Sequence, residues 1–335
     1  MKVLELFSGV GGMRVGLAQS APTPLEFVAV DLNQGCNEIY KESFGDTPLP
    51  LDICSLSLDW FIQLGAKLWT MSPPCQPYTR QGNQKDMQDD RAKPLIHICH
   101  IIETIPEHGL PACIIVENVK NFELSDSFIE LKRVLQIRGY ALSGYLVNPL
   151  YMGFPNSRLR FFLVAIRKKN IEKSEFQILS LEEEVGERKS VADFLCSTDH
   201  DHVHDVPLSI LTKRAAFCFD IVALQSVQSL CFTRAYTKFI DGTGSVLYTG
   251  AELEGMTWDD KSRPIFKNVK CMSELSRSLR YFCPREAARL NGFGTTLCIP
   301  CDGGKRYYRA IGNSLNPQVV ARLVDIHSEE IFSSV

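Results

Sequence analysis

The sequence of 335 residues lacks several features that would assign it at once to a class of protein. Its uninterrupted apolar stretches, such as residues 161–166, are far too short to cross a bilayer. A strand-like pattern occupies residues 1–9, so we expect no signal peptide there. Neither sign of charge dominates: 36 Lys and Arg stand against 39 Asp and Glu, for a net charge of −3. This balance argues against a general polyanion-binding surface but allows a local basic cleft.

The sequence also has no internal repeat and no low-complexity tract. Hydrophobic residues make up 45% of the chain and charged residues 22%, which is typical of one large or two modest globular domains and excludes a disordered chain. Twelve cysteines without a secretion signal indicate reduced thiols rather than a disulfide framework. We therefore expect a cytoplasmic, and also nuclear, protein that does not contact membranes.

Charge is unevenly distributed along the chain. Residues 171–205 contain 3 Lys or Arg and 10 Asp or Glu, a local net charge of −7, which leaves +4 for the rest. This acidic stretch has no clear periodicity, which is typical of a linker or a solvated surface segment. We place a domain boundary after Lys169.

The first half alternates between short apolar runs and helical patterns, which predicts an α/β fold with an open, mostly parallel, Rossmann-like sheet. Ligands of such sheets bind at the carboxyl ends of the strands. Strands are expected at Val3–Phe7, Phe27–Val30, a run ending at Asp52-Ile53, Lys67–Met71, Cys113–Val116 and Leu159–Ile166, and helices at Met13–Ser20, Asn37–Glu42, Leu95–Ile105 and Ser127–Arg138.

A glycine-rich segment, Phe7-Ser8-Gly9-Val10-Gly11-Gly12, follows the first expected strand. Its glycines allow a sharp turn that brings backbone N–H groups close to a ligand at a helix N-terminus. The spacing is not that of the dinucleotide-binding pattern, and a plain strand-to-helix turn is the alternative interpretation. Asp31 ends the second strand, where a carboxylate can hold ribose hydroxyls, and Asp52 could flank an adenine. Together they favour a nucleoside cofactor with a charged tail.

A rigid loop, Met71-Ser72-Pro73-Pro74-Cys75-Gln76-Pro77-Tyr78, follows another expected strand. Two prolines directly before Cys75 exclude helix or central strand there. A cysteine on such a loop is well placed to act as a nucleophile. The alternative is that Cys75 is one of many inert thiols.

Charged residues border two further apolar runs. Glu117 follows residues 114–116, where an apolar setting can raise a carboxyl pKa and suit proton donation. Its alternative role is that of a helix cap or surface charge. Arg158 and Arg160 open a later strand and share one face by the period of two, so they could bind a carboxylate, a phosphate or a base carbonyl. A pair of exposed charges is the alternative.

In this order, these segments resemble the motifs of the cytosine-C5 methyltransferases over nearly the whole chain. Gly312-Asn313-Ser314 stands in the place of the last family motif. Within that family the chain is most similar to the eukaryotic tRNA cytosine-C5 methyltransferases that resemble DNA methyltransferases. Their hallmark appears as Cys231-Phe232-Thr233-Arg234-Ala235-Tyr236 followed by Gly242-Thr243-Gly244-Ser245, with Leu279–Phe282 and Pro284–Glu286 further along. The chain departs from that pattern at Asn121 and Ala235, where glycine is usual, and at Cys283, where threonine is usual.

The resemblance implies methylation of cytosine 38 in the anticodon loop of tRNA-Asp, with S-adenosylmethionine as cofactor and a flipped-out base. It implies that the Cys75 thiolate adds at C6 of the base, that Glu117 stabilises protonation at N3, that Arg160 holds the cytosine O2 and Glu117, and that Arg158 supports loop or backbone contacts. We expect a monomer that binds tRNA, with weak DNA binding. The rivals are a DNA cytosine-C5 methyltransferase and a non-catalytic nucleic-acid-binding protein.

The expected catalytic residues are Cys75, Glu117, Arg158 and Arg160. The expected cofactor-binding residues are Phe7, Ser8, Gly9, Val10, Gly11, Gly12, Asp31, Leu32, Asp52, Ile53, Ser72, Asn313 and Ser314. The expected substrate-binding residues are Cys231, Phe232, Thr233, Arg234 and Tyr236, with Arg234, Lys238, Arg285 and Arg289 as candidates for phosphate contacts.

Three domains follow from the motif order: a catalytic domain over residues 1–170, an acidic linker and target-recognition domain over 171–306, and a C-terminal segment, 307–335, that returns to the catalytic domain. Cys298 and Cys301 have zinc or redox spacing, but no second pair stands at a recognised zinc spacing. The run His200–His204 is expected to be a solvated loop. No metal is expected.

Overall fold

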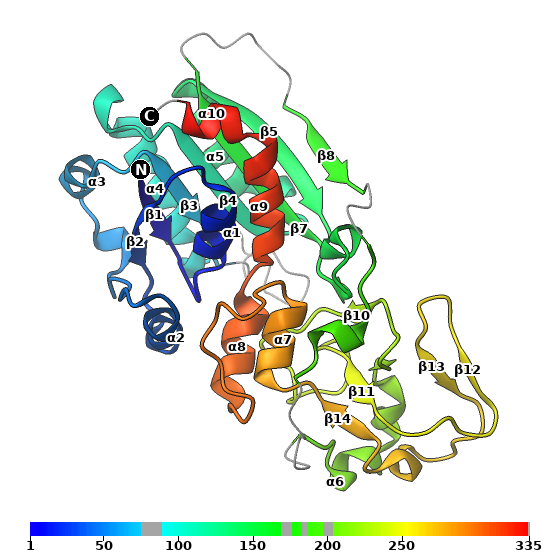
Figure 1. Cartoon of the computed structure of the whole chain (residues 1–335). Helices are drawn as coiled ribbons and strands as arrows, with labels where there is room; N and C mark the ends of the chain where they lie inside the picture. The colour runs from blue at the N-terminus through cyan, green and yellow to red at the C-terminus, as the bar shows by residue number, and fades with distance from the viewer. Residues whose placement is uncertain (75–88, 169–175, 183–186, 197–203, 334–335) are drawn as a thin grey trace. The chain divides into compact units, whose positions relative to one another are not determined.

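The structure, a computed structural model, describes residues 1–74, 89–168, 176–182, 187–196 and 204–333. It divides into two compact units (Figure 1). Unit 1 comprises Met1–Asn148, Leu159–Glu182 and Pro317–Val335, and unit 2 comprises Pro149–Arg158 and Glu183–Asn316.

Unit 1 is built on a mixed sheet that has seven strands among the described residues. The strands are β1 (Lys2–Leu6), β2 (Glu26–Val30), β3 (Leu68–Met71), β4 (Cys113–Val119), β5 (Tyr140–Val147), β7 (Arg160–Arg167) and β8 (Ile178–Leu181). Their order is β2-β1-β3-β4-β7-β5-β8. The strands from β2 to β4 are parallel, whereas β7 runs antiparallel to both β4 and β5. The register pairs Leu6 with Met71 and Met71 with Val116, so the carboxyl ends of β1, β3 and β4 share one edge.

Helices cover both faces of this sheet (Figure 1). They are α1 (Gly12–Ser20), α2 (Gln34–Phe44), α3 (Leu58–Leu64), α4 (Lys93–Thr104), α5 (Asp126–Ile137), α9 (Pro317–Ile326) and α10 (Ser328–Phe332). Helices α4 and α5 pack together against one face, where alternate strand residues such as Leu4, Trp69 and Ile114 join apolar side chains of both helices in one buried core. Alternation of this kind follows from the period of two along a strand.

Helix α9 packs along α1 on the other face (Figure 1). The approach is close because Gly16 has no side chain: a Cβ there would lie 2.5 Å from the carbonyl oxygen of Pro317 and 2.5 Å from Cβ of Val320. The end of the chain is thereby held against the helix that follows the glycine-rich segment.

The predicted α/β fold is confirmed, and most predicted elements of the first half are present within a few residues. The strand expected to end at Asp52-Ile53 is wrong. Leu49 makes only an isolated bridge with Val30, and Asp52 instead caps a short 3₁₀ helix, Ile53–Ser55, by accepting the backbone N–H of Cys54 at 3.0 Å. An Asp before a short helical turn satisfies one of its free N–H groups, so the same residue suits either environment.

The acidic stretch was interpreted as a linker or a solvated surface segment, and its exposed part in unit 1 is a strand. Part of it, β8, pairs in parallel with β5, with Ile178 opposite Gly144, so unit 1 continues to Glu182 rather than ending near Lys169. At the other end of the chain, residues 307–316 belong to unit 2, and unit 1 resumes at Pro317 rather than at Tyr307. Strand β8 is apolar in sequence, Ile-Leu-Ser-Leu, but it is short, largely exposed and set within an acidic stretch, and the sequence analysis did not identify it.

Unit 2 contains short strands and few long helices. Its strands are β6 (Asn156–Ser157), β9 (Ile221–Val222), β10 (Ser229–Leu230), β11 (Val246–Tyr248), β12 (Met256–Trp258), β13 (Pro264–Phe266) and β14 (Leu279–Tyr281), and its helices are α6 (Leu208–Leu211), α7 (Pro284–Leu290) and α8 (Lys305–Asn313). They form a sheet in the order β14-β11-β9 and the pairs β10-β6 and β12-β13. Neither unit has a helix, within the described ranges, that is long and apolar enough to span a membrane.

Candidate active site

The glycine-rich segment makes a tight turn between β1 and α1. Three of its residues have backbone φ angles in the left-handed region: Phe7 at 54°, Gly9 at 54° and Gly11 at 83°. At Gly11 a Cβ would lie 2.5 Å from the ring of Phe44, whereas at Gly9 it would meet no heavy atom within 4 Å. Gly11 is therefore required for packing, while Gly9 borders open space. A non-glycine residue such as Phe7 in this region is uncommon and is a feature of functional sites.

Asp31 joins this turn to the end of β2. Its carboxylate accepts the backbone N–H of Gly9 at 2.8 Å and that of Asn33 at 2.7 Å. Burial raises the pKa of this carboxyl, although both hydrogen bonds act to lower it. The neighbouring Leu32 is 63% exposed, which is unusual for a large apolar side chain. The end of β2 thus presents a carboxylate and an uncovered apolar surface beside the turn.

Glu5, which the sequence analysis did not single out, contacts the start of the helix that follows the same turn. It lies on β1, is 1% exposed, and accepts hydrogen bonds from the hydroxyl of Tyr40 at 2.9 Å and the backbone N–H of Arg14 at 3.2 Å. Burial raises the pKa of Glu5 to about 7. The one signal was an acidic residue inside an otherwise apolar strand, a position that such residues occupy only with partners.

The other expected cofactor-binding residues of unit 1 line these same segments. Val10 is buried, Gly12 begins α1, Ile53 is buried in the 3₁₀ helix after Asp52, and Ser72 is half-buried just beyond β3. The hydroxyl of Ser8 is buried and has no hydrogen-bond partner among the described residues. A buried hydroxyl of this kind is available to a further hydrogen-bond partner.

Glu117 and Arg160 lie together near the end of β4. Glu117 follows the apolar residues 114–116 within the strand, which runs on to Val119. Antiparallel pairing sets Val119 opposite Arg160, and Nε of Arg160 lies 3.5 Å from Oε1 of Glu117. The expected contact between these two side chains is confirmed. Both side chains are mostly buried, at 20% and 10% exposed for Arg160 and Glu117.

The loop that leads to the candidate nucleophile starts beside this pair. Pro73 and Pro74 follow β3, the parallel neighbour of β4, and the amide of Asn118 donates a hydrogen bond to the carbonyl of Pro73 at 3.2 Å. Cys75 itself lies outside the described residues. Asn118 therefore ties the start of the Cys75 loop to the strand that carries Glu117.

Arg158 does not share a site face with Arg160. It belongs to unit 2, where its guanidinium donates to Sγ of Cys231 at 2.9 Å and to the carbonyl oxygens of Phe232, Gly312 and Ser314. The prediction that both arginines share one strand face is wrong, because β7 begins only at Arg160 and Arg158 lies before the strand. Arg158 is 3% exposed, so its observed role is to hold two segments of unit 2 together through their backbones, in line with the support role expected for it.

The Cys-Phe-Thr segment is partly core. Phe232 and Tyr236 are each 3% exposed, and the Tyr236 hydroxyl donates to the carbonyl of Ser245 at 2.7 Å and accepts the N–H of Phe282 at 3.0 Å. These two aromatic rings pack against each other, with centroids 5.0 Å apart. Both residues therefore have a packing role in unit 2. Arg234 is exposed and Thr233 is half-buried.

Gly312 allows α8 to touch this segment. A Cβ there would lie 2.2 Å from the backbone nitrogen of Arg234 and 2.2 Å from the carbonyl carbon of Thr233. Asn313 is exposed and Ser314 is half-buried, and both belong to unit 2 rather than to the unit that carries the glycine turn.

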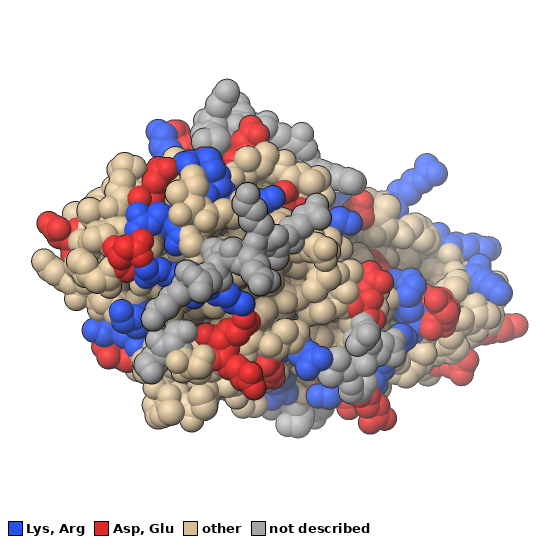
Figure 2. Space-filling view, turned by 90° about the horizontal axis from the view of Figure 1, so that it is seen from above, with Lys and Arg blue, Asp and Glu red and all other residues tan. Residues whose placement is uncertain are grey.

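Two of the four candidates for phosphate contacts donate hydrogen bonds to backbone carbonyls of the chain itself. Arg285 donates to the carbonyl of Ile299 at 2.8 Å and Arg289 to that of Leu195 at 2.6 Å. Arg234 and Lys238 are exposed. On the face seen in Figure 2, basic and acidic side chains are interspersed. Contacts to a polyanion would therefore depend on individual residues such as Arg234 and Lys238 rather than on a large positively charged surface.

Comparison with known proteins decides the family. The residue pattern described as C-5 cytosine-specific DNA methylase matches residues 1–328. A tRNA (cytosine(38)-C(5))-methyltransferase of Schizosaccharomyces pombe is 35% identical, over 99% of this chain and 98% of the relative. A DNA (cytosine-5)-methyltransferase of Dictyostelium discoideum is 30% identical, over 97% and 94%. The crystal structure of S. pombe Dnmt2 methyltransferase superposes with a TM-score of 0.82 and 34% identity, covering 99% of both chains.

The chain belongs to the C-5 cytosine-specific methyltransferase family.

Two departures from the pattern expected of this methyltransferase family have a structural explanation. Asn121, in place of a glycine, has a φ of 82°, and asparagine tolerates this left-handed conformation better than most residues. Cys283, in place of a threonine, precedes α7 and accepts the N–H of Glu286 on its sulfur at 3.4 Å. A threonine hydroxyl would cap the helix in the same way. Nothing in the structure explains Ala235.

Proposed function

We propose that this methyltransferase transfers a methyl group from S-adenosylmethionine to C5 of cytosine 38 in the anticodon loop of tRNA-Asp. The observation that carries the proposal is the full-length similarity to an enzyme named for that position in tRNA, at 35% identity. The pair Glu117–Arg160, beside the loop that leads to Cys75, supplies the acid–base and positioning groups that the reaction needs.

The features around the glycine turn fit S-adenosylmethionine. The open space at Gly9 leaves room for a ligand to approach the backbone, and the unpartnered hydroxyl of Ser8 could bind a polar group of it. The carboxylate of Asp31 suits the two ribose hydroxyls, and the exposed side chain of Leu32 suits one face of the adenine. Bound there, the cofactor would supply an electrophilic methyl group.

The residues of the chain then have to make cytosine nucleophilic. The Cys75 thiolate adds to C6 of the ring, and the electron pair displaced from the C5–C6 double bond raises the electron density at C5. Glu117 holds a proton at N3, which stabilises the ring during addition, and Arg160 fixes the Glu117 carboxylate. Once C5 carries the methyl group, loss of its proton to a base returns an electron pair to the ring and expels the Cys75 thiolate.

An anticodon loop suits this chemistry, because C6 of a stacked and paired cytosine is inaccessible and must be flipped out. A loop base is already unpaired, which lowers that cost. Arg234 and Lys238 are exposed beside the Cys-Phe-Thr segment and are the basic side chains that we assign to the RNA backbone.

The test compares substrates side by side. Purified protein is incubated with labelled S-adenosylmethionine and either a tRNA-Asp transcript, the same transcript with cytosine 38 replaced by uridine, or a duplex DNA. We expect incorporation into the first alone. Methylation of DNA at an equal or higher rate would overturn the tRNA assignment, and it is the alternative because a relative named as a DNA methyltransferase is 30% identical.

A second arm tests the nucleophile. Cys75→Ala should reduce methyl transfer at least about 10⁴-fold and leave cofactor affinity, measured by calorimetry, nearly unchanged. The matched control is Cys54→Ala, a thiol that is exposed in the same unit and has no assigned role. A tRNA carrying 5-fluorocytosine should form a covalent complex with the unsubstituted protein, and no complex would contradict the proposed adduct.

A further inference from the structure

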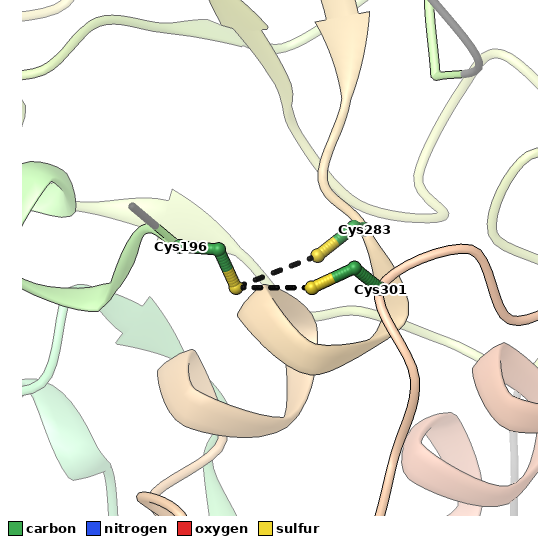
Figure 3. Close-up of side chains that lie close together, drawn as sticks. All are labelled: Cys196, Cys283 and Cys301. Carbon is green, nitrogen blue, oxygen red and sulfur yellow. Dashed lines mark hydrogen bonds between the residues drawn. The ribbon is translucent and has the colours of Figure 1, made fainter. Parts of the chain in front are cut away.

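Three thiols that are far apart in the sequence meet inside unit 2 (Figure 3). Cys196 follows a 3₁₀ helix, Val191–Phe194, Cys283 directly precedes α7, and Cys301 lies in the loop before α8. Sγ of Cys196 lies 3.5 Å from Sγ of Cys301 and 3.9 Å from that of Cys283. All three sulfurs lie within 4.8 Å of one another.

This spacing matches that of ligands around one metal ion. Zinc–sulfur bonds of about 2.3 Å in a tetrahedron place neighbouring sulfurs about 3.8 Å apart. The two shorter separations, 3.5 and 3.9 Å, lie on either side of that value. Thiolate ligands also select zinc over magnesium, calcium or manganese.

The backbone around the cluster is held by buried polar groups. The carboxylate of Glu286, which is fully buried, accepts the N–H of Cys196 at 3.1 Å and that of Cys283 at 2.9 Å. Arg280 pairs with the same carboxylate through two hydrogen bonds of 2.8 and 3.0 Å. One ion pair therefore fixes the backbone of two of the three cysteines.

The third cysteine is positioned by a separate contact. Nε2 of His204 lies 2.8 Å from the carbonyl oxygen of Cys301. Cys298 is exposed three residues earlier on the same loop, in the Cys-x-x-Cys spacing that zinc-binding loops use. The missing second pair in the sequence is thus supplied by Cys196 and Cys283, which are 87 residues apart.

We propose that Cys196, Cys283 and Cys301 bind one structural zinc ion, with Cys298, whose sulfur lies outside the group of three, moving in as the fourth ligand. Binding replaces each S–H bond by a zinc–sulfur bond and releases one proton per thiol to solvent, with no change in oxidation state. The ion ties the segment after residue 194 to the start of α7 and to the loop before α8. Because α8 carries Gly312, which touches the Cys-Phe-Thr segment, the ion stabilises that part of unit 2. This proposal does not rest on the proposed function.

The experiment uses the full chain, reduced and stripped of metal with a chelator, and then loaded with zinc chloride or cobalt chloride. After gel filtration we expect about one zinc per chain by mass spectrometry of the metal. Cobalt should give the sulfur-to-metal charge-transfer absorption of thiolate ligands. Cys196→Ser, Cys283→Ser and Cys301→Ser should each weaken zinc affinity at least tenfold, and Cys298→Ser should weaken it too.

Cys218→Ser is the matched control, since Cys218 is exposed in the same unit and lies outside the cluster. It should retain zinc fully. Cys283→Ser keeps a side-chain acceptor for the N–H of Glu286, so α7 should stay capped and circular dichroism should be unchanged. The cobalt spectrum of the unsubstituted chain needs no variant and remains informative if one misfolds. No retained zinc with no charge-transfer band, or equal zinc in the triple serine variant, would overturn the proposal.

Discussion

The two units of this methyltransferase position their important side chains by different means. In unit 1 they stand at strand ends, and the hydrogen-bonded ladder that aligns β1, β3 and β4 also aligns the glycine turn, the Pro-Pro loop and Glu117. In unit 2 the strands have two or three residues, and one buried guanidinium, that of Arg158, connects segments more than 70 residues apart. Backbone hydrogen bonds between strands position the important residues of unit 1, whereas individual side chains position those of unit 2.

The largest effect should separate the two arginines that stand two residues apart. Arg158→Ala leaves the carbonyls of Phe232 and Gly312 without this donor, and we expect unit 2 to lose about 4 kcal/mol of stability. Arg160→Ala should lower the rate of methyl transfer at least about 100-fold with a smaller loss of stability. Urea denaturation and single-turnover kinetics of both variants measure the two quantities.

Arg158→Lys is the informative control, because a single ammonium cannot reproduce a planar fork of donors, so it should rescue little stability. Equal stability losses in Arg158→Ala and Arg160→Ala would mean that the division of labour between the arginines is wrong.

A second, smaller effect contrasts one glycine of each unit. Gly312→Ala would place a Cβ 2.2 Å from the backbone of Thr233 and Arg234, and we expect a loss of about 3 kcal/mol in unit 2. In Gly9→Ala the new Cβ meets no atom, so only the positive φ destabilises the fold, by about 1 kcal/mol. The added methyl group should nevertheless weaken S-adenosylmethionine binding at least tenfold. Thermal denaturation and calorimetry distinguish the two.

Unchanged cofactor affinity in Gly9→Ala would separate the glycine turn from the cofactor. Gly45→Ala serves as the control, because Gly45 also has a positive φ of 81° with open space around it but follows α2 and is not part of the glycine-rich segment.

The smallest effect concerns pH and unit 1. Burial raises the pKa of Glu5 from 4.5 to about 7, so the folded state binds a proton more tightly than the unfolded chain. The stability that this proton contributes is complete below about pH 4.5 and is lost as the pH rises to about 7. Between pH 5 and pH 8 we expect a decrease of about 2 kcal/mol in the free energy of unfolding.

Glu5→Gln should remove this decrease in stability between pH 5 and pH 8, since an amide does not titrate. The control is Glu26→Gln on the neighbouring strand, which should show the same decrease as the unsubstituted protein because Glu26 is exposed. Urea denaturation at several pH values provides the measurement. An identical slope in the Glu5→Gln variant would exclude Glu5 as the source.

The sequence predicted unit 1 well because its signals are local. Apolar runs separated by helical periods identified β1, β2, β3, β4 and β7, and glycines marked the turn. Errors remained: strands β5 and β8 were not identified although both contain apolar residues, and Asp52 was placed at a strand end because its side chain suits a helix cap as well.

The candidate site shows the same limit. Motif residues such as Asp31 and Glu117 were identified from their places after or within apolar runs, and their contacts with Gly9 and Arg160 are present. Glu5 was missed because a strand pattern does not show which side chain is buried with partners. The burial of Phe232 and Tyr236 was not predicted, because a motif does not distinguish a contact with a ligand from a contact with the core.

By itself, the sequence determined the family, the α/β class and the order of the motifs, because these depend on residue types and on spacing along the chain. Only the tertiary structure decided that Arg158 and Arg160 serve different units, and that Cys196, Cys283 and Cys301 share one place. Such groupings depend on where distant segments cross in space. No pattern along the chain encodes a distance between residues that are 87 or 105 positions apart.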